Sequence, residues 1–365
     1  MKQKKYIISG GGTGGHIFPA LSIANELKAK DPLCEILFVG AIGRMEMEKV
    51  PAAGYEIIGL PIMGLPRKPS VKMFQFLKNW FKSKSLARKI VKDFQPDAVI
   101  GVGGYASGPI LNMASKLGVP TILQEQNSYA GLTNRMLSKR AKKICVAYDE
   151  MERYFPADRI VMTGNPVRRD LLNLPDKSNG KAHFELKDDK PTLLVLGGSL
   201  GAKSINDVLL AKIDHLAQMD VNVIWQTGKL YYKRITKELE GRTPGNVHIL
   251  EFISKMDMAY SAADMIVSRA GAGTISELCL VGKPIILIPS PNVAEDHQTK
   301  NAMALVKKNA AVMVRDSQIE DSLLSSIEEL LKDDSQMAEL SKNIKELAKP
   351  DAASHIVDEI KDAIV

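Results

Sequence analysis

Short runs of β-branched and other apolar residues alternate with amphipathic stretches along the first half of the chain. The apolar runs predict strands at 6–9, 35–39, 98–101, 121–123 and 143–146. Helical spacing of apolar positions predicts helices at 17–30, 109–117 and 132–140. Because strands separated by helices of this length form βαβ units, the pattern indicates a parallel sheet.

The alternation breaks at residues 165–190 and then resumes. This stretch holds Pro166, Pro175 and a polar cluster at 176–181, which is typical of a domain boundary. Beyond it, strands are expected at 192–196, 222–226, 247–250, 265–267, 284–288 and 311–314, and helices from 203 and at 273–281 and 297–308.

The fold class expected from this pattern is α/β, with two doubly wound Rossmann-like domains that face a deep cleft. We expect an N-terminal domain of residues 1–164 and a C-terminal domain of residues 165–345. Doubly wound sheets bind ligands beyond the carboxyl ends of their strands, so the cleft is the expected active site.

Composition fits this picture and excludes several classes of protein. A chain of 365 residues is long enough for two domains, and 45% hydrophobic with 25% charged residues is ordinary for a globular protein. Cys34, Cys145 and Cys279 are widely separated and form no CxxC spacing, which argues against a disulfide scaffold or a zinc ribbon. No apolar run is long enough to span a bilayer, and the basic start leads into only a short apolar stretch, unlike a signal peptide. The sequence therefore predicts a soluble cytoplasmic protein.

Glycine-rich loops follow two of the predicted strands in the first half. Residues 10–15 (GGGTGG) contain the GxGxxG spacing, and His16 follows at the start of the next helix. A dinucleotide site is disfavoured because no acidic residue ends the second strand. The alternatives are a tight strand–helix turn and a loop that holds a diphosphate or a sugar. Because His16 is expected near the start of a helix, the positive end of the helix dipole favours the neutral form of its imidazole, which is the form that a general base needs. Residues 101–109 (GVGGYASGP) repeat this arrangement.

Polar and glycine-rich segments also follow strands elsewhere. Residues 124–127 (QEQN) are either helix caps or ligand-binding groups, and residues 197–202 (GGSLGA) open the second domain with Ser199 placed to bond a phosphate. In residues 268–277 (SRAGAGTISE), small side chains let a ligand approach, and Glu277 is either a ribose partner or a solvated helix carboxylate. Asp296 is an N-cap candidate, followed by two candidate sugar partners, His297 and Gln298.

Several motifs of other enzyme classes are missing from the sequence. There is no GxxxxGK[ST], no HExxH and no DxD, so neither a P-loop nor an obvious metal clamp is present. The diphosphate of a sugar nucleotide would then be neutralised by helix N-termini and basic side chains, for which Arg168 is one candidate.

The net charge of +7 is concentrated between residues 67 and 92, which hold nine basic residues and no acidic one. On a helix, the apolar residues of 73–81 gather on one side. Adsorption to an anionic membrane surface is one interpretation, packing of the apolar side on the domain is the other, and nucleic acid is disfavoured. The membrane interpretation uses Lys72, Phe74, Lys78, Trp80, Phe81 and Lys82.

Seven motifs in order along the chain resemble those of the MurG family of GT-B glycosyltransferases. They are GGGTGGHIFPA at 10–20, GVGGYASGP at 101–109, EQN at 125–127, GNPVR at 164–168, GGSLGA at 197–202, RAGAGTISEL at 269–278 and DHQTKNA at 296–302. The resemblance implies an inverting enzyme of peptidoglycan synthesis at the cytoplasmic face of the inner membrane. Such enzymes transfer N-acetylglucosamine from UDP-N-acetylglucosamine to the muramoyl 4-hydroxyl of lipid I, forming lipid II without a cofactor.

By the same resemblance, His16 and Glu125 are the candidate catalytic residues. The acceptor would lie against Thr13, Gly14, Gly15, Gly103, Gly104, Tyr105 and Asn127. The donor would lie against Arg168, Ser199, Phe252, Ile253, Ala272, Gly273, Thr274, Glu277, His297 and Gln298. A helix at 346–365 would return to the N-terminal domain. Two alternatives stay open: a GT-B enzyme with another lipid acceptor, and a UDP-binding peripheral membrane protein without activity.

Overall fold

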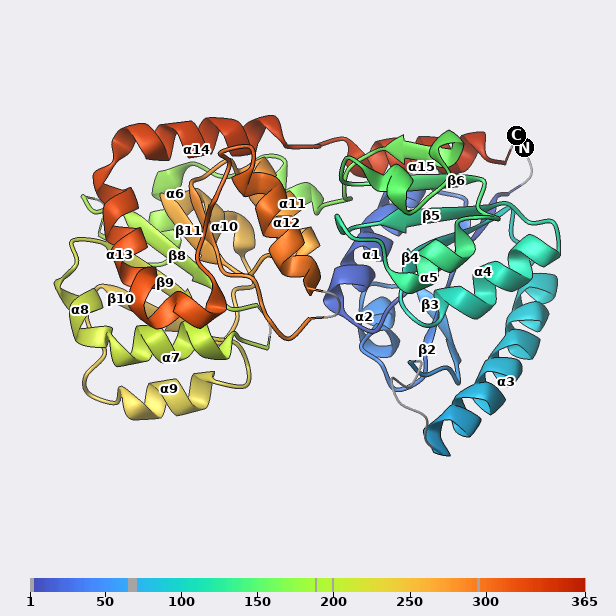
Figure 1. Cartoon of the computed structure of the whole chain (residues 1–365), viewed down its shortest axis with the longest axis horizontal. Helices are drawn as coiled ribbons and strands as arrows, with labels where there is room; N and C mark the ends of the chain where they lie inside the picture. Colours follow the sequence, from blue (N-terminus) through green and yellow to red (C-terminus); the bar gives the residue numbers. More distant parts are fainter. Residues whose placement is uncertain (1–2, 65–70, 188, 199, 294–295, 365) are drawn as a thin grey trace. The chain divides into compact units, whose positions relative to one another are not determined.

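A computed structural model of the chain describes residues 3–64, 71–187, 189–198, 200–293 and 296–364, with the backbone alone at residues 71, 72 and 169. The chain divides into two compact units (Figure 1). Unit 1 is residues 1–167 with 349–365, and unit 2 is residues 168–348. Both crossings between the units lie three residues beyond the boundaries expected from the sequence, at 164 and 345.

Unit 1 is built on a seven-stranded parallel sheet in the order β3-β2-β1-β4-β5-β6-β7. Its strands are β1 Lys5–Gly10, β2 Glu35–Ala41, β3 Glu56–Leu60, β4 Ala98–Gly103, β5 Thr121–Glu125, β6 Lys143–Val146 and β7 Ile160–Met162. Its helices are α1 Gly14–Lys30, α2 Glu46–Ala52, α3 Val71–Phe94, α4 Ser107–Lys116, α5 Leu132–Leu137 and α15 Ala352–Asp362. The strand order reverses between β1 and β4, the place where doubly wound sheets bind ligands.

The C-terminal helix α15 belongs to the core of unit 1. Ile356, Val357 and Ile360 are fully buried and join the apolar cluster that contains Ile8 and Ile100. At the helix surface, Lys143 pairs with Glu359 at 2.9 Å. Helix α15 therefore completes the apolar core of unit 1, to which β1 also contributes.

Unit 2 has a six-stranded parallel sheet in the order β10-β9-β8-β11-β12-β13, reversing between β8 and β11. Its strands are β8 Thr192–Leu196, β9 Asn222–Gln226, β10 Val247–Leu250, β11 Met265–Ser268, β12 Ile285–Leu287 and β13 Val312–Met313. Its helices are α6 Lys177–His183, α7 Lys203–Ala211, α8 Ile213–Gln218, α9 Tyr232–Glu238, α10 Met256–Ala262, α11 Ala272–Val281, α12 His297–Val306, α13 Ile319–Lys332 and α14 Asp334–Glu346. Helix α6 lies inside the stretch expected to be a domain boundary, and its buried Lys181 donates to the carbonyl of Lys190 just before β8.

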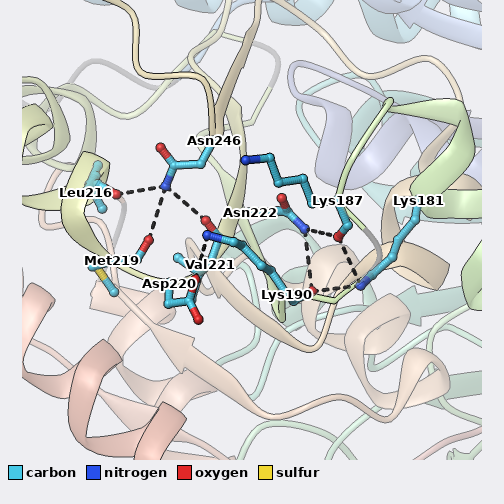
Figure 2. A network of polar contacts seen from close by, with 9 residues as sticks. All are labelled: Lys181, Lys187, Lys190, Leu216, Met219, Asp220, Val221, Asn222 and Asn246. Atoms are coloured by element: carbon cyan, nitrogen blue, oxygen red, sulfur yellow. Dashed lines mark hydrogen bonds and ion pairs between the residues drawn. The ribbon is translucent and has the colours of Figure 1, made fainter.

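A polar network closes the amino ends of β8, β9 and β10 (Figure 2). The Lys181 ammonium donates to the Lys190 carbonyl at 2.7 Å, and the Asn222 amide donates to the Lys187 carbonyl at 2.8 Å. The Asn246 amide donates to the Leu216 carbonyl at 2.9 Å. These side chains therefore satisfy backbone carbonyls of α8 and of the segment before β8 at this edge of the sheet.

Candidate functional site

The first candidate site forms at the carboxyl end of β1, where the chain turns into α1. The helix begins at Gly14, three residues earlier than predicted, so His16 lies in its first turn. The His16 Nδ1 atom lies 3.1 Å from the Gly11 carbonyl oxygen and 3.3 Å from Thr13 Oγ1. Because a carbonyl only accepts, the contact with Gly11 places a proton on Nδ1 and leaves the lone pair of the neutral imidazole on Nε2.

The glycine loop after β4 packs directly against the first loop. Gly103 and Gly104 have φ angles of +96° and +89°, a region that glycine alone adopts readily. A Cβ on Gly103 would lie 2.8 Å from His16 Nε2, and one on Gly104 would lie 2.4 Å from the Gly11 carbonyl oxygen. The structure therefore brings the two predicted glycine loops and His16 together.

Glu46, the first residue of α2, belongs to the same site although no sequence motif predicted it. Its side chain is buried, and its Oε2 and Oε1 atoms accept hydrogen bonds from the backbone N–H groups of Gly12 (2.8 Å) and Ala41 (2.9 Å). An acidic side chain thus does lie beside the end of β2. It comes from α2 and not from the strand itself, and it binds backbone N–H groups. No local pattern marks it, since its partner Gly12 is 34 residues earlier in the chain.

Glu125, at the end of β5, is buried and saturated with hydrogen bonds. Its Oε1 accepts from the backbone N–H and side-chain amide of Asn127 (3.1 and 3.3 Å), and its Oε2 accepts from the Gly131 N–H (3.0 Å) and the Asn134 amide (2.9 Å). Burial raises the pKa of the Glu125 carboxyl, and these donors oppose that rise. The geometry is that of a carboxylate that holds the loop leading into α5.

Thr13 and Tyr105 are exposed at the same edge of the sheet, whereas Asn127 is half-buried. The Tyr105 ring lies over Gly64, where a Cβ would come within 2.7 Å of the Tyr105 hydroxyl. Thr13, directly before α1, and Tyr105, in the loop after β4, are thus the exposed members of this set.

Unit 2 contains a pocket of about 720 Å³ at the carboxyl ends of β8 and β11. Its lining includes Gly198 and Gly201 of the loop before α7, Thr274 in the first turn of α11, and Gln298 of α12. The Gln298 Oε1 atom accepts from the Ser290 N–H at 2.9 Å. The structure thus brings three of the predicted donor segments to one pocket, and Ala272 and Gly273 lie in the same turn as Thr274. Ser199 lies outside the described residues.

Arg269 forms part of the pocket wall, a role that no pattern in the sequence predicted. Its guanidinium donates to the Ile288 carbonyl at 3.1 Å, to the Ser204 hydroxyl at 2.7 Å and to the Asp316 carboxylate. These bonds fix the start of α7 and the end of β12 around one side chain. Arg269 therefore shapes the pocket while its own charge is balanced by Asp316.

The remaining predicted donor residues lie outside the described lining of this pocket. Glu277 Oε1 pairs with Arg168 Nε at 3.3 Å, and its Oε2 accepts from the Tyr260 hydroxyl at 3.2 Å. Burial raises the pKa of the Glu277 carboxyl, against the opposing effect of Arg168. Phe252 is 61% exposed, whereas the Ile253 side chain is buried in the core. His297 is half-buried at the first position of α12.

Helix α3 divides the residues predicted to meet a membrane. Phe74, Leu77 and Phe81 are exposed, and Lys78 and Lys82 are exposed beside them. Among the described residues, no helix combines the length and the apolar character needed to cross a membrane. The Lys72 side chain lies outside the described residues.

Trp80 differs from the prediction because it faces the protein. A Cβ on Gly108 of α4 would lie 3.4 Å from the Trp80 ring, which also stacks on Phe76 with a centroid distance of 6.3 Å. The apolar side of α3 is thus only partly covered by the protein. Trp80 packs against α4, whereas Phe74 and Phe81 are exposed.

Two parallel-sheet Rossmann-like units, each with a glycine loop at the point where its strand order reverses, define the GT-B class of glycosyltransferases. Residues 6–146 match the N-terminal domain of glycosyltransferase family 28, and residues 192–356 match the C-terminal domain of that family. The chain belongs to glycosyltransferase family 28.

Relatives match over nearly the whole chain. A protein of Parabacteroides distasonis is 55% identical over 361 residues, covering 99% of this chain and 98% of its own. One of Flavobacterium psychrophilum is 53% identical over 361 residues, with the same shares covered. Both are named UDP-N-acetylglucosamine–N-acetylmuramyl-(pentapeptide) pyrophosphoryl-undecaprenol N-acetylglucosamine transferase. The solved structure of Acinetobacter baumannii MurG is similar with a TM-score of 0.79 at 32% identity, covering 98% of this chain and 99% of that one.

Proposed function

We propose that the protein transfers N-acetylglucosamine from UDP-N-acetylglucosamine to the muramoyl 4-hydroxyl of lipid I, which gives lipid II for peptidoglycan synthesis. The observation that carries this proposal is the 55% identity, over nearly the full length of both chains, to a protein whose name states this transfer. Membership of glycosyltransferase family 28 supports the reaction class.

The proposal assigns the sugar nucleotide to unit 2. The glycine loop at 197–202 and the first turn of α11 offer backbone N–H groups to the diphosphate, since the start of a helix favours anions. Ser199 and Arg168 would also meet the diphosphate, and His297 and Gln298 the sugar. Glu277 would accept the ribose hydroxyls. Phe252 would meet the uracil with its ring, and Ile253 with its backbone, because its side chain is buried.

The proposal assigns the acceptor to unit 1. The lipid diphosphate would lie at the start of α1 and at the loop of Gly103 and Gly104. The Gly12 N–H already donates to Glu46, and the N–H groups of His16 and Ile17 donate to the Thr13 carbonyl. The helix donors left for a phosphate are therefore those of Gly14 and Gly15. Thr13, Tyr105 and Asn127 would surround the acceptor sugar.

In the proposed reaction, the muramoyl 4-hydroxyl attacks the anomeric carbon of the donor from the side opposite UDP. A new bond forms between that oxygen and the anomeric carbon, and UDP departs with the electron pair of the broken bond. His16 Nε2 takes the hydroxyl proton, a step worth about 10²–10⁴-fold in rate. Glu125 is the weaker candidate base, because four hydrogen bonds occupy its oxygens and it is buried.

The outward face of α3 would hold unit 1 on the anionic cytoplasmic surface of the inner membrane, where the lipid acceptor lies. Phe74 and Phe81 would enter the interface, and Lys78 and Lys82 would meet anionic headgroups.

The test measures UDP release from UDP-N-acetylglucosamine with and without a lipid I analogue, with EDTA present throughout. Release that depends on the acceptor and survives EDTA is the expected result. Release without the acceptor would indicate hydrolysis or a different acceptor. Binding of UDP without any release would favour a binding protein or a metal requirement, and a His16→Ala variant with near-normal turnover would remove His16 as the base.

A further inference from the structure

Glu46 is a buried carboxylate that the proposed transfer chemistry does not use directly. Its side chain is 1% exposed, while Glu48 and Lys49 on the same helix are exposed. Its two oxygens accept hydrogen bonds from the backbone N–H groups of Gly12, in the loop after β1, and of Ala41, the last residue of β2. Hydrogen bonds to an ionised acceptor are among the stronger ones in proteins, so Glu46 joins this loop to the end of β2.

The chain keeps room for this carboxylate at two glycine positions. A Cβ on Gly11 would lie 2.2 Å from Glu46 Oε1, and a Cβ on Gly40 would lie 2.5 Å from Glu46 Cγ. Any larger residue at either position would displace the carboxylate. Gly11 and Gly40 therefore leave the space that the Glu46 side chain occupies.

A single peptide group connects Glu46 to His16. The N–H of the Gly11–Gly12 peptide donates to Glu46 Oε2 at 2.8 Å, and the carbonyl of the same peptide lies 3.1 Å from His16 Nδ1. Because the peptide group is planar, fixing its N–H end also fixes the direction of its carbonyl. Hydrogen bonds in such a chain polarise one another, so the carboxylate makes the Gly11 oxygen a better acceptor for the Nδ1 proton.

We propose that Glu46 is a positioning residue for His16 and acts through the Gly11–Gly12 peptide. It holds the imidazole in the tautomer with its proton on Nδ1, directs Nε2 toward the acceptor hydroxyl, and favours the imidazolium that forms when Nε2 takes the proton. This inference rests on the proposed role of His16 as the general base.

The test compares Glu46→Gln in the full-length protein with Glu48→Gln, an exposed carboxylate two residues along α2. Glutamine can accept one of the two N–H groups, and its own amide opposes the other. We expect kcat to fall about 10–100-fold for Glu46→Gln, with the KM for UDP-N-acetylglucosamine changed less than about twofold. Glu48→Gln is expected to keep the parent kcat.

A double-mutant cycle with His16→Ala separates positioning from a general loss of folded protein. If Glu46 acts through His16, Glu46→Gln lowers the residual rate of the His16→Ala variant by less than about twofold. An equal fall of kcat in both backgrounds, or a parent kcat for Glu46→Gln, would overturn the inference and leave His16 as the base. Near-normal turnover of His16→Ala alone would overturn both. Glu46→Asp, which keeps the charge, should recover part of the rate, and circular dichroism should show matching unfolding midpoints for the variants compared.

Discussion

Glu277 combines burial, an arginine partner and a tyrosine hydroxyl donor, and these contacts make its proposed role testable by pH. Burial raises the pKa of the Glu277 carboxyl, so on acidification it takes up a proton at a higher pH than an ordinary glutamate. Only the ionised Glu277 carboxylate can accept hydrogen bonds from both ribose hydroxyls. Affinity for UDP-N-acetylglucosamine should therefore be full above this raised pKa and should fall as the pH drops through it. Isothermal titration calorimetry between pH 5 and 8 measures this.

Glu277→Gln should remove this pH dependence and weaken binding at pH 8 by about 1.5–3 kcal/mol, the usual contribution of hydrogen bonds to a charged group. Tyr260→Phe, which removes only the hydroxyl that donates to Glu277, should weaken the binding of UDP-N-acetylglucosamine by about 0.5–1.5 kcal/mol. UDP-N-acetylglucosamine is the right ligand because its diphosphate, esterified at both ends, does not titrate in this range. Unchanged affinity and an unchanged pH profile in Glu277→Gln would exclude Glu277 from ribose binding.

The residues that could be predicted from the sequence are those inside a contiguous motif at the end of a strand. His16 and Gly103 were predicted in this way, because a strand followed by glycines and a helix defines a local geometry. Glu46 and Arg269 could not be assigned from pattern, since each acts through partners far away in the chain. Glu46 reaches back 34 residues to Gly12, and Arg269 reaches forward 47 residues to Asp316.

Helix α3 presents Phe74, Leu77 and Phe81 outward, and if the proposed membrane contact is made through them, their replacement should weaken binding to vesicles. A Phe74→Ser, Phe81→Ser double variant should lower affinity for vesicles containing phosphatidylglycerol by at least about tenfold, because each fully buried aromatic side chain is worth about 1.5–3 kcal/mol. Co-sedimentation with vesicles of defined composition measures this affinity. Leu33→Ser is the matched control, since Leu33 is 76% exposed in the same unit but outside α3.

Charge reversal at Lys72, Lys78 and Lys82 tests the electrostatic part separately. Each lysine near an anionic surface contributes about 1 kcal/mol, so the triple variant should lose binding to anionic vesicles and show little further loss at high salt. Trp80→Ala should instead lower the unfolding temperature, because its ring packs against α4. Unchanged vesicle binding after both the aromatic and the lysine changes would leave α3 as an ordinary surface helix.

Strands were easier to predict than helices for a physical reason. Four of the six strands of unit 2, and the five central strands of unit 1, are mostly buried apolar runs, as expected for parallel sheets covered on both faces. The edge strands β3 and β7 were missed because they are partly exposed and lack such runs. Helix α6 was missed because its sequence, KSNGKAH, is polar and short, and its burial depends on tertiary contacts of Gly180 and Lys181.

Each unit of the chain has apolar clusters of its own, so each unit has its own source of stability against unfolding. Ile356 of α15 lies in a cluster confined to unit 1, and Ile327 of α13 lies in a cluster confined to unit 2. The proline-containing break at 165–190 allowed the division of the chain into two domains to be predicted from the sequence. The return of α15 is set by the burial of Ile356, Val357 and Ile360, which only the fold reveals.

Separate cores predict that the two units respond separately to core substitutions and to ligand. Ile356→Ala and Ile327→Ala remove the same atoms from fully buried sites, and each should cost about 2–5 kcal/mol in its own unit. UDP-N-acetylglucosamine at 100 times its Kd should stabilise the unit that binds it by about 2.7 kcal/mol. Calorimetric scans should then show Ile327→Ala lowering the transition that the ligand raises, and Ile356→Ala lowering the other. If both variants moved one ligand-sensitive transition by the same amount, the units would unfold as one body, and the two cores would be coupled in stability.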